Sequence, residues 1–121
     1  MTVLRKEPGR QWEIVEIENT LEALQESVGG YIETVNIYED ACIICNEEGR
    51  LIGLPYNCMI KGVDFVGPIL IVGVSGEDFC GIPMEAAVRI ANKFNFRMAL
   101  GGADKNKGTR LTFILIEELK Q

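Results

Sequence analysis

The 121-residue sequence contains no histidine. Histidine is the usual general base near neutral pH and the commonest zinc ligand in proteins. Its absence excludes the Ser-His and Cys-His pairs of nucleophilic catalysis. A lysine or a carboxylate could still act as a base, but no local sequence signature indicates one. We therefore expect no catalytic residues, no cofactor and no enzymatic activity.

Long apolar runs are also missing. The longest, Ile69–Val74, is far shorter than the roughly 20 residues that a membrane-spanning helix needs. The first ten residues contain Arg5, Lys6, Glu7 and Arg10 and lack the apolar stretch of a signal peptide. We expect a protein of the cytoplasm that does not contact a membrane.

Cysteine is sparse, and its pattern does not predict a disulfide framework, which is typical of small secreted chains with a poor core. We expect reduced, buried thiols. Cys42 and Cys45 have the spacing of a metal knuckle or a redox pair, but the two residues between them are β-branched isoleucines, which favour a strand. Positions three apart on a strand point to opposite faces. We therefore expect no metal site and no redox pair there.

Basic side chains are outnumbered: 12 Lys and Arg residues stand against 18 Asp and Glu residues, for a formal net charge of −6. This balance disfavours general nucleic-acid binding, which depends on neutralising phosphates. Residues 1–60 hold four basic against eleven acidic side chains, whereas residues 85–121 hold seven basic against four acidic ones. The acidic and basic regions could bind different partners, or they could attract each other within one fold or across an oligomer. The alternative is that both are ordinary solvated surface.

The length and the 47% hydrophobic content are sufficient for one domain with its own core, and we place a single domain over residues 1–121. Alternation and turn residues predict that strands dominate the middle of the chain. The expected strands are Thr2–Arg5, Trp12–Ile17, Tyr31–Tyr38, Ala41–Asn46, Leu51–Ile52, Val63–Phe65, Ile69–Val74 and Leu111–Ile116.

Two helices are predicted. The first follows Asn19 as its N-cap and stops at Gly29-Gly30, and the second has Pro83 in its first turn and an apolar stripe from Ala86 to Phe94. Residues 47–50 predict a hairpin turn with Gly49 at a positive φ, and residues 53–57 predict a loop. The order of elements indicates an α+β fold with a small mixed or antiparallel sheet and two flanking helices.

Two segments are candidates for ligand binding. Tyr56 and Asn57 follow a proline, and an aromatic face with a neighbouring amide could stack on and hydrogen-bond a planar ligand. The alternative is that they pack against their own sheet.

The second candidate is the basic segment after the second helix, with Arg97 at its start. Lys105, Lys107 and Arg110 follow the Gly101-Gly102 turn, whose backbone amides could form an anion nest for a phosphate. No glycine segment has the Lys-Ser/Thr ending of a P-loop.

Several segments together resemble the domain of unknown function 3846 family over roughly residues 10–95. They are Asn19–Gln25, Val28–Glu33, Cys45–Asn57, Gly67–Gly73 and Glu77–Phe79. The resemblance implies a product of phages, plasmids or conjugative elements and brings no catalytic residue with it. The basic segment after Phe94 departs from the family pattern.

We therefore expect a non-enzymatic, phage or mobile-element protein that binds a small phosphorylated ligand. Such a ligand could be a nucleotide immune signal, sequestered by a homo-oligomer as counter-defence. The alternative is an acidic interaction module that inhibits a host protein or mimics nucleic acid. Its acidic residues would be Glu13, Glu16, Glu18, Glu22, Glu26, Glu39, Asp40, Glu47 and Glu48. The third hypothesis is that the protein is an uncharacterised enzyme.

Overall fold

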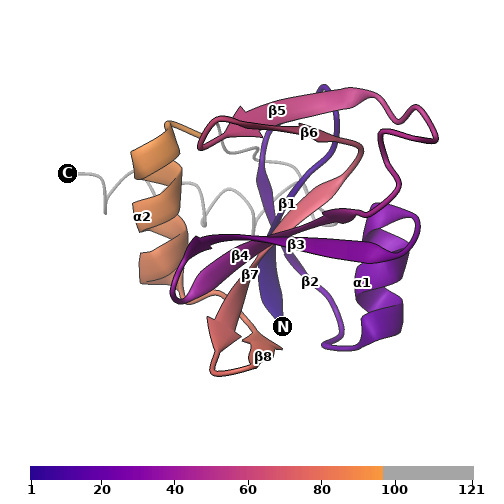
Figure 1. Ribbon diagram of the computed structural model, residues 1–121. Coiled ribbons are helices and arrows are strands. Elements are labelled where there is room, and N and C mark those ends of the chain that lie inside the picture. Colours follow the sequence, from indigo (N-terminus) through magenta and orange to yellow (C-terminus); the bar gives the residue numbers. More distant parts are fainter. Residues whose placement is uncertain (97–121) are drawn as a thin grey trace, which may run out of the picture.

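A six-stranded antiparallel sheet forms the centre of the protein, and the computed structural model describes residues 1–96 (Figure 1). The main path of this sheet runs β2-β1-β7-β4-β3, with β8 paired to β7, while β5 and β6 form a separate two-stranded sheet. The elements in chain order are β1 (Thr2–Lys6), β2 (Glu13–Glu16), α1 (Leu21–Val28), β3 (Ile32–Tyr38), β4 (Ala41–Asn46), β5 (Tyr56–Ile60), β6 (Val63–Val66), β7 (Ile69–Ser75), β8 (Asp78–Cys80) and α2 (Met84–Phe94).

The central strands β4 and β7 bury side chains on both faces of the sheet, so successive residues enter two different cores. On one face Ile43 and Ile71 pack with α2 and with the inner side of the β5–β6 sheet. On the other face Ile44 and Leu70 pack with α1. The helices therefore cover opposite faces of the sheet, as Figure 1 shows.

The helix α1 is fixed at both ends. Its N-cap is Thr20, whose hydroxyl accepts a hydrogen bond from the Ala23 N–H at 3.1 Å. The predicted cap, Asn19, is wrong by one residue, because its amide instead donates to the carbonyl of Phe79 at 3.0 Å. Gly29 ends the helix in the left-handed conformation, as predicted.

The predicted hairpin over residues 47–52 is wrong. These residues form turns, and Leu51 is 85% exposed. Gly49 does not have a positive φ, but a Cβ there would lie 2.9 Å from the Val66 side chain, so its role is close packing. The loop predicted over residues 53–57 ends two residues too late, because Tyr56 and Asn57 are the first residues of β5.

The remaining predictions for residues 1–96 are confirmed within a residue or two: the β1–β2 hairpin, β3, β4, β6, β7 and α2, whose N-cap is Pro83. The α+β class is confirmed, and every strand pairing in the described part is antiparallel. No helix within residues 1–96 is long and apolar enough to cross a membrane. The predicted loop over residues 101–108 and the predicted strand Leu111–Ile116 lie outside the described residues.

Candidate functional site

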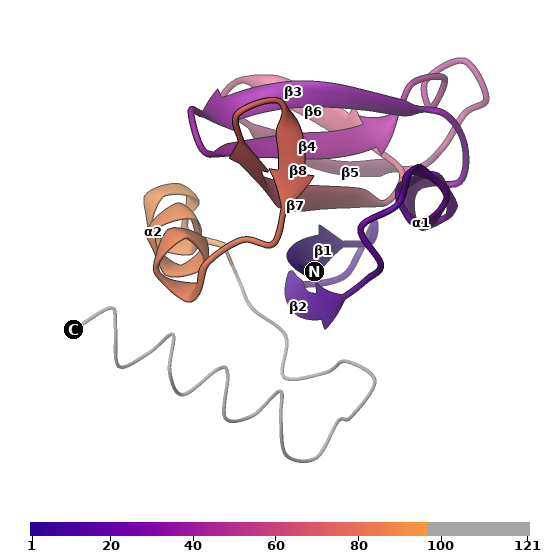
Figure 2. The same cartoon turned by 90° about the horizontal axis from the view of Figure 1, so that it is seen from below.

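A groove of about 760 Å³ lies between α1 and the β1–β2 hairpin. Figure 2 shows α1 beside this hairpin at one end of the sheet. We call it the acidic groove, for the charges described below. Its apolar lining residues are Ile17, Ala23, Val28, Leu54 and Pro68, and its polar ones include Thr20 and Ser27.

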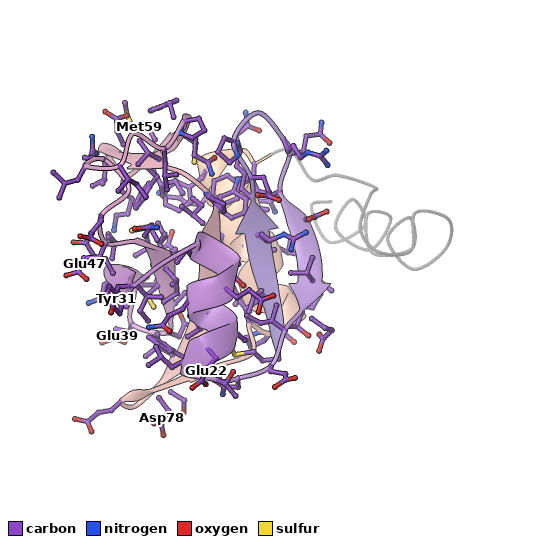
Figure 3. All side chains as sticks on the ribbon, turned by 90° about the vertical axis from the view of Figure 1, so that its right-hand side faces the viewer. Glu22, Tyr31, Glu39, Glu47, Met59 and Asp78 are labelled. Carbon is purple, nitrogen blue, oxygen red and sulfur yellow. The ribbon has the colours of Figure 1, made fainter. Side chains whose placement is uncertain are left out.

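Four carboxylates line this groove. Glu22 and Glu26 stand four residues apart on α1, which places them on the same side of the helix, and Figure 3 labels Glu22 near the start of α1. Glu7 and Glu18 come from the segments that follow β1 and β2. Glu18, Glu22 and Glu26 are exposed, so their charges face solvent.

Among residues 1–96, the only cation that lines the groove is Arg5. It stands opposite Glu13 on the paired strands β1 and β2. Its Nε donates to Glu13 Oε1 at 3.1 Å, and its Nη2 forms an ion pair with the same oxygen. Because Glu13 balances the charge of Arg5, the four carboxylates leave the groove strongly negative.

The wall that α1 provides is held in place by the core beneath it. Leu24 and Val28 are buried against the sheet. Asn46, at the end of β4, donates its amide to the Val28 carbonyl at 3.1 Å and accepts from the Glu48 N–H at 2.8 Å. This contact satisfies a carbonyl in the last turn of the helix, which has no partner within the helix. The groove is therefore formed by fixed elements.

The predicted site residues Tyr56 and Asn57 do not line the groove. The Asn57 side chain is buried, and its amide donates to the carbonyls of Lys6 at 2.9 Å and Gly67 at 2.7 Å. Its Oδ1 accepts from Lys6 Nζ at 2.8 Å. Asn57 thus joins β5 to β1 and to Gly67, the residue after β6, and its hydrogen-bonding groups are used within the fold.

Tyr56 is 57% exposed on β5, and its hydroxyl donates to Asp64 on β6 at 3.1 Å. Local desolvation, together with the hydrogen bond and negative charge of Asp64, raises the pKa of the Tyr56 phenol. The other predicted ligand residues, Arg97, Lys105, Lys107 and Arg110, lie outside the described residues.

A second group of charges surrounds Tyr38 at the end of β3. Lys61 Nζ and the Arg89 guanidinium carbon each lie 5.6 Å from the centre of the Tyr38 ring. Lys61 also donates to the Ile37 carbonyl at 3.1 Å, and Arg89 forms an ion pair with Asp40 at 3.2 Å. Both cations are thus engaged by the protein itself.

The prediction of buried thiols is confirmed for Cys42 and Cys45 and is wrong for Cys58 and Cys80, which are half-buried. Cys42 and Cys45 lie in the cores on opposite faces of the sheet, and all four cysteines are free. Burial raises the pKa of the Cys42 thiol to about 11. Burial, with the nearby Glu33 carboxylate, raises the pKa of Cys45 to about 11. Within residues 1–96, no group of three or more Cys, Asp or Glu side chains is placed to hold a metal ion.

The sequence indicated acidic character in this half of the chain but not the groove. Its lining residues come from positions 5 to 68, so no local spacing joins them. Glu7, which lines the groove, was absent from the predicted acidic set. The usable signal was the pair Glu22 and Glu26, whose spacing on a helix predicts two carboxylates on one side.

A comparison with protein families places residues 1–95 within the model described as "Domain of unknown function (DUF3846)". Searches of curated proteins and of solved structures find no match to the chain.

Proposed function

Since this chain belongs to the domain of unknown function family DUF3846, we propose its function from the groove itself: it is a non-enzymatic binding protein whose acidic groove holds a basic segment of a partner protein. The observation that carries the proposal is the convergence of four glutamates on one groove in which Arg5, the single arginine that the described residues contribute, is already paired.

The mixture of apolar and acidic lining suits lysine and arginine side chains. These side chains lay their aliphatic stems along apolar surface and keep the charged end in water or on a carboxylate. The half-buried Ile17 and Leu54 offer such surface, and Glu22 and Glu26 offer the carboxylates.

Charge would also speed the encounter. A surface of one sign attracts a partner of the opposite sign over about one Debye length, roughly 10 Å at 0.1 M salt. We expect a partner with a run of Lys and Arg, such as a nucleic-acid-binding protein of the cell in which this chain is made. The exposed carboxylates of the groove would then stand in for the phosphates of that protein's usual ligand.

The exposure of the glutamates supports binding over catalysis. Carboxylates that act as general acids or bases are typically desolvated so that their pKa moves toward neutrality. Three of the four groove glutamates are exposed. In the described part of the chain, the groove lining contains no cysteine, tyrosine or lysine that could act as a nucleophile or a base.

The phosphorylated-ligand hypothesis stays a prediction, and residues 1–96 give it less support. The groove carboxylates would repel a phosphate. The cations near Tyr38 are engaged with Asp40 and the Ile37 carbonyl, and the amide of Asn57 is used within the fold. The remaining candidates for that ligand, Arg97, Lys105, Lys107 and Arg110, lie outside the described residues.

The test is fluorescence anisotropy of the full chain with a labelled peptide of alternating Lys and Ala, and with a Glu-Ala peptide as the negative probe. We expect the Lys-Ala peptide to bind and its affinity to fall as salt rises. The Glu22→Gln/Glu26→Gln variant should lose about fivefold or more in affinity, as two exposed ion pairs of up to about 1 kcal/mol each allow.

The matched control is Glu39→Gln/Glu47→Gln, which makes the same change in net charge. Figure 3 shows Glu39 and Glu47 on the side of α1 away from the β1–β2 hairpin, and neither lines the groove. Equal losses in the two double variants would mean that general charge, and no groove, binds the peptide. That result would overturn the proposal.

A further inference from the structure

The acidic groove and the basic segment that follows the described residues belong to one chain. Residues 97–110, here called the basic tail, contain four basic side chains and one acidic one. We propose that in the free protein Lys105, Lys107 and Arg110 of the same chain occupy the acidic groove, and that a partner's basic segment must displace them. This inference rests on the groove binding cations, as proposed above.

The point where the described chain ends favours this occupant. The ring of Phe96 stacks on that of Trp12, with centroids 4.4 Å apart. Trp12 directly precedes Glu13, the residue that pairs with Arg5 of the groove. Trp12 belongs to the core on the α2 face, whereas the groove lies beside α1 on the other face. β2 is an edge strand, so the side of the sheet that carries Phe96 and the side that carries the groove meet at this edge. A chain that continues from Phe96 has only to pass around β2 to reach the groove.

The length of the tail is sufficient. Nine residue steps separate Phe96 from Lys105, and an extended chain spans about 3.3–3.6 Å per residue, or about 30 Å in all. A path around an edge strand, from the layer on one face to the layer on the other, covers about 20 Å, since layers pack about 10 Å from a sheet. Lys105 can therefore reach the groove of its own chain, and Lys107 and Arg110 follow within five residues.

Tethering makes a weak attraction effective. A short linker gives its end an effective concentration in the millimolar range at a site within reach. Suppose that the three cations and four carboxylates, as separate molecules, associate with a dissociation constant of about 0.1 mM. An effective concentration of about 1 mM is ten times this constant, so the tail would occupy the groove about nine-tenths of the time. The glutamates of the groove would be neutralised by the chain itself until a competitor arrives.

The first experiment compares the full chain with its Lys105→Gln/Lys107→Gln/Arg110→Gln variant, using the labelled Lys-Ala peptide. Freeing a groove that is occupied nine-tenths of the time raises the apparent affinity about tenfold. The matched control is Arg10→Gln/Arg89→Gln/Lys93→Gln, which removes three exposed cations from the described part of the chain. Equal affinities in the two triple variants would overturn the inference.

The second experiment cross-links the unsubstituted full chain with a carbodiimide, which joins an amine directly to a carboxylate in contact with it. We expect amide links from Lys105 or Lys107 to Glu18, Glu22 or Glu26, recovered from monomeric chains by peptide mass spectrometry. Links recovered only from dimers, or from neither lysine to these glutamates, would overturn the proposal of docking within one chain.

The two proposals fail differently. If the Lys-Ala peptide binds through Glu22 and Glu26, while the tail variant gains no affinity and the tail forms no link to the groove, the proposed function stands and this inference falls. If the links form but the peptide binds neither the full chain nor its tail variant, the groove is an internal contact and the proposed function falls.

Discussion

Lys6 and Asn57, 51 residues apart in the chain, are joined by two hydrogen bonds: the lysine ammonium donates to the asparagine Oδ1 at 2.8 Å, and the asparagine amide donates to the lysine carbonyl at 2.9 Å. A third bond runs from the same amide to the Gly67 carbonyl at 2.7 Å. A side chain that looked available for a ligand therefore holds the β5–β6 sheet to β1 of the central sheet.

Replacing Asn57 should destabilise the protein. Asn57→Ala removes three hydrogen bonds and leaves the carbonyls of Lys6 and Gly67 without their side-chain donor, so we expect a loss of about 2–4 kcal/mol in the free energy of unfolding. Chemical denaturation measures this loss. Lys6→Met keeps both amide bonds, loses only the bond to the asparagine Oδ1, and should cost less, about 1–2 kcal/mol. Equal losses in the two variants would show that the amide does not join the sheets.

The buried thiols predict a loss of stability at high pH. The pKa values of Cys42 and Cys45 are about 11 in the folded protein against an ordinary value of 9.0. Between about pH 9 and pH 11 the unfolded chain releases these protons and the folded chain keeps them. The free energy of unfolding should therefore fall as the pH rises, by up to about 1.4 kcal/mol per pH unit for each thiol.

Denaturation of the full chain and of Cys42→Ala/Cys45→Ala at pH 8, 9 and 10 checks this dependence. The variant starts less stable because it loses buried volume, but the thiol contribution to its slope should vanish. Identical slopes in the two proteins would contradict the raised pKa values. At pH 8 we also expect both thiols to resist alkylation in the folded chain.

Gly73 is predicted to tolerate no side chain. A Cβ at this position of β7 would lie 2.6 Å from the Gly81 carbonyl oxygen and 3.1 Å from that of Cys80. Backbone atoms cannot rotate away, so Gly73→Ala should cost about 1–3 kcal/mol and loosen β8. Gly76→Ala provides the comparison: its φ is +63 but no atom lies within 4 Å, and we expect about 1 kcal/mol. Thermal unfolding should rank the two variants in this order.

The N-cap of α1 gives a further prediction. Thr20→Ala removes the acceptor for the Ala23 N–H at the start of the helix that forms one wall of the groove. We expect a loss of about 1 kcal/mol in the free energy of unfolding. Thr20→Ser keeps the hydroxyl and should cost only a few tenths of that. If both substitutions cost the same, the hydroxyl does not cap the helix.

Most of the fold was predictable because its central strands and two helices carry strong local patterns. The strand β5 was missed for a physical reason. The irregularity between Tyr56 and Cys58 breaks the two-residue period, so the inward positions are Asn57 and Ile60, three apart. The inward Asn57 is polar, whereas the outward Tyr56 and Met59 are 57% and 60% exposed. This arrangement inverts the usual relation between polarity and burial.

The groove could not be predicted from local patterns, because it is a property of the assembled elements. Glu22 and Glu26 could be placed on one side of a helix, but nothing in their spacing brings them near Glu7 or Pro68. The difference in net charge between the two ends of the chain, in contrast, was visible in the sequence. The position of Phe96 against Trp12, which lies just before the edge strand β2, required the fold.

The two-sided burial of β4 has a consequence for how the strands find their alignment. A strand that is apolar on one face only cannot slip by one residue without exposing its core, but Ala41 to Cys45 are apolar on both faces, so such a slip costs little hydrophobic burial. Two exceptions favour one alignment: Asn46, whose amide donates to the Val28 carbonyl at the end of α1, and Gly73, where the absence of a side chain lets the backbone of Cys80 and Gly81 approach. Substituting either residue should therefore broaden the set of pairings that the folding chain samples.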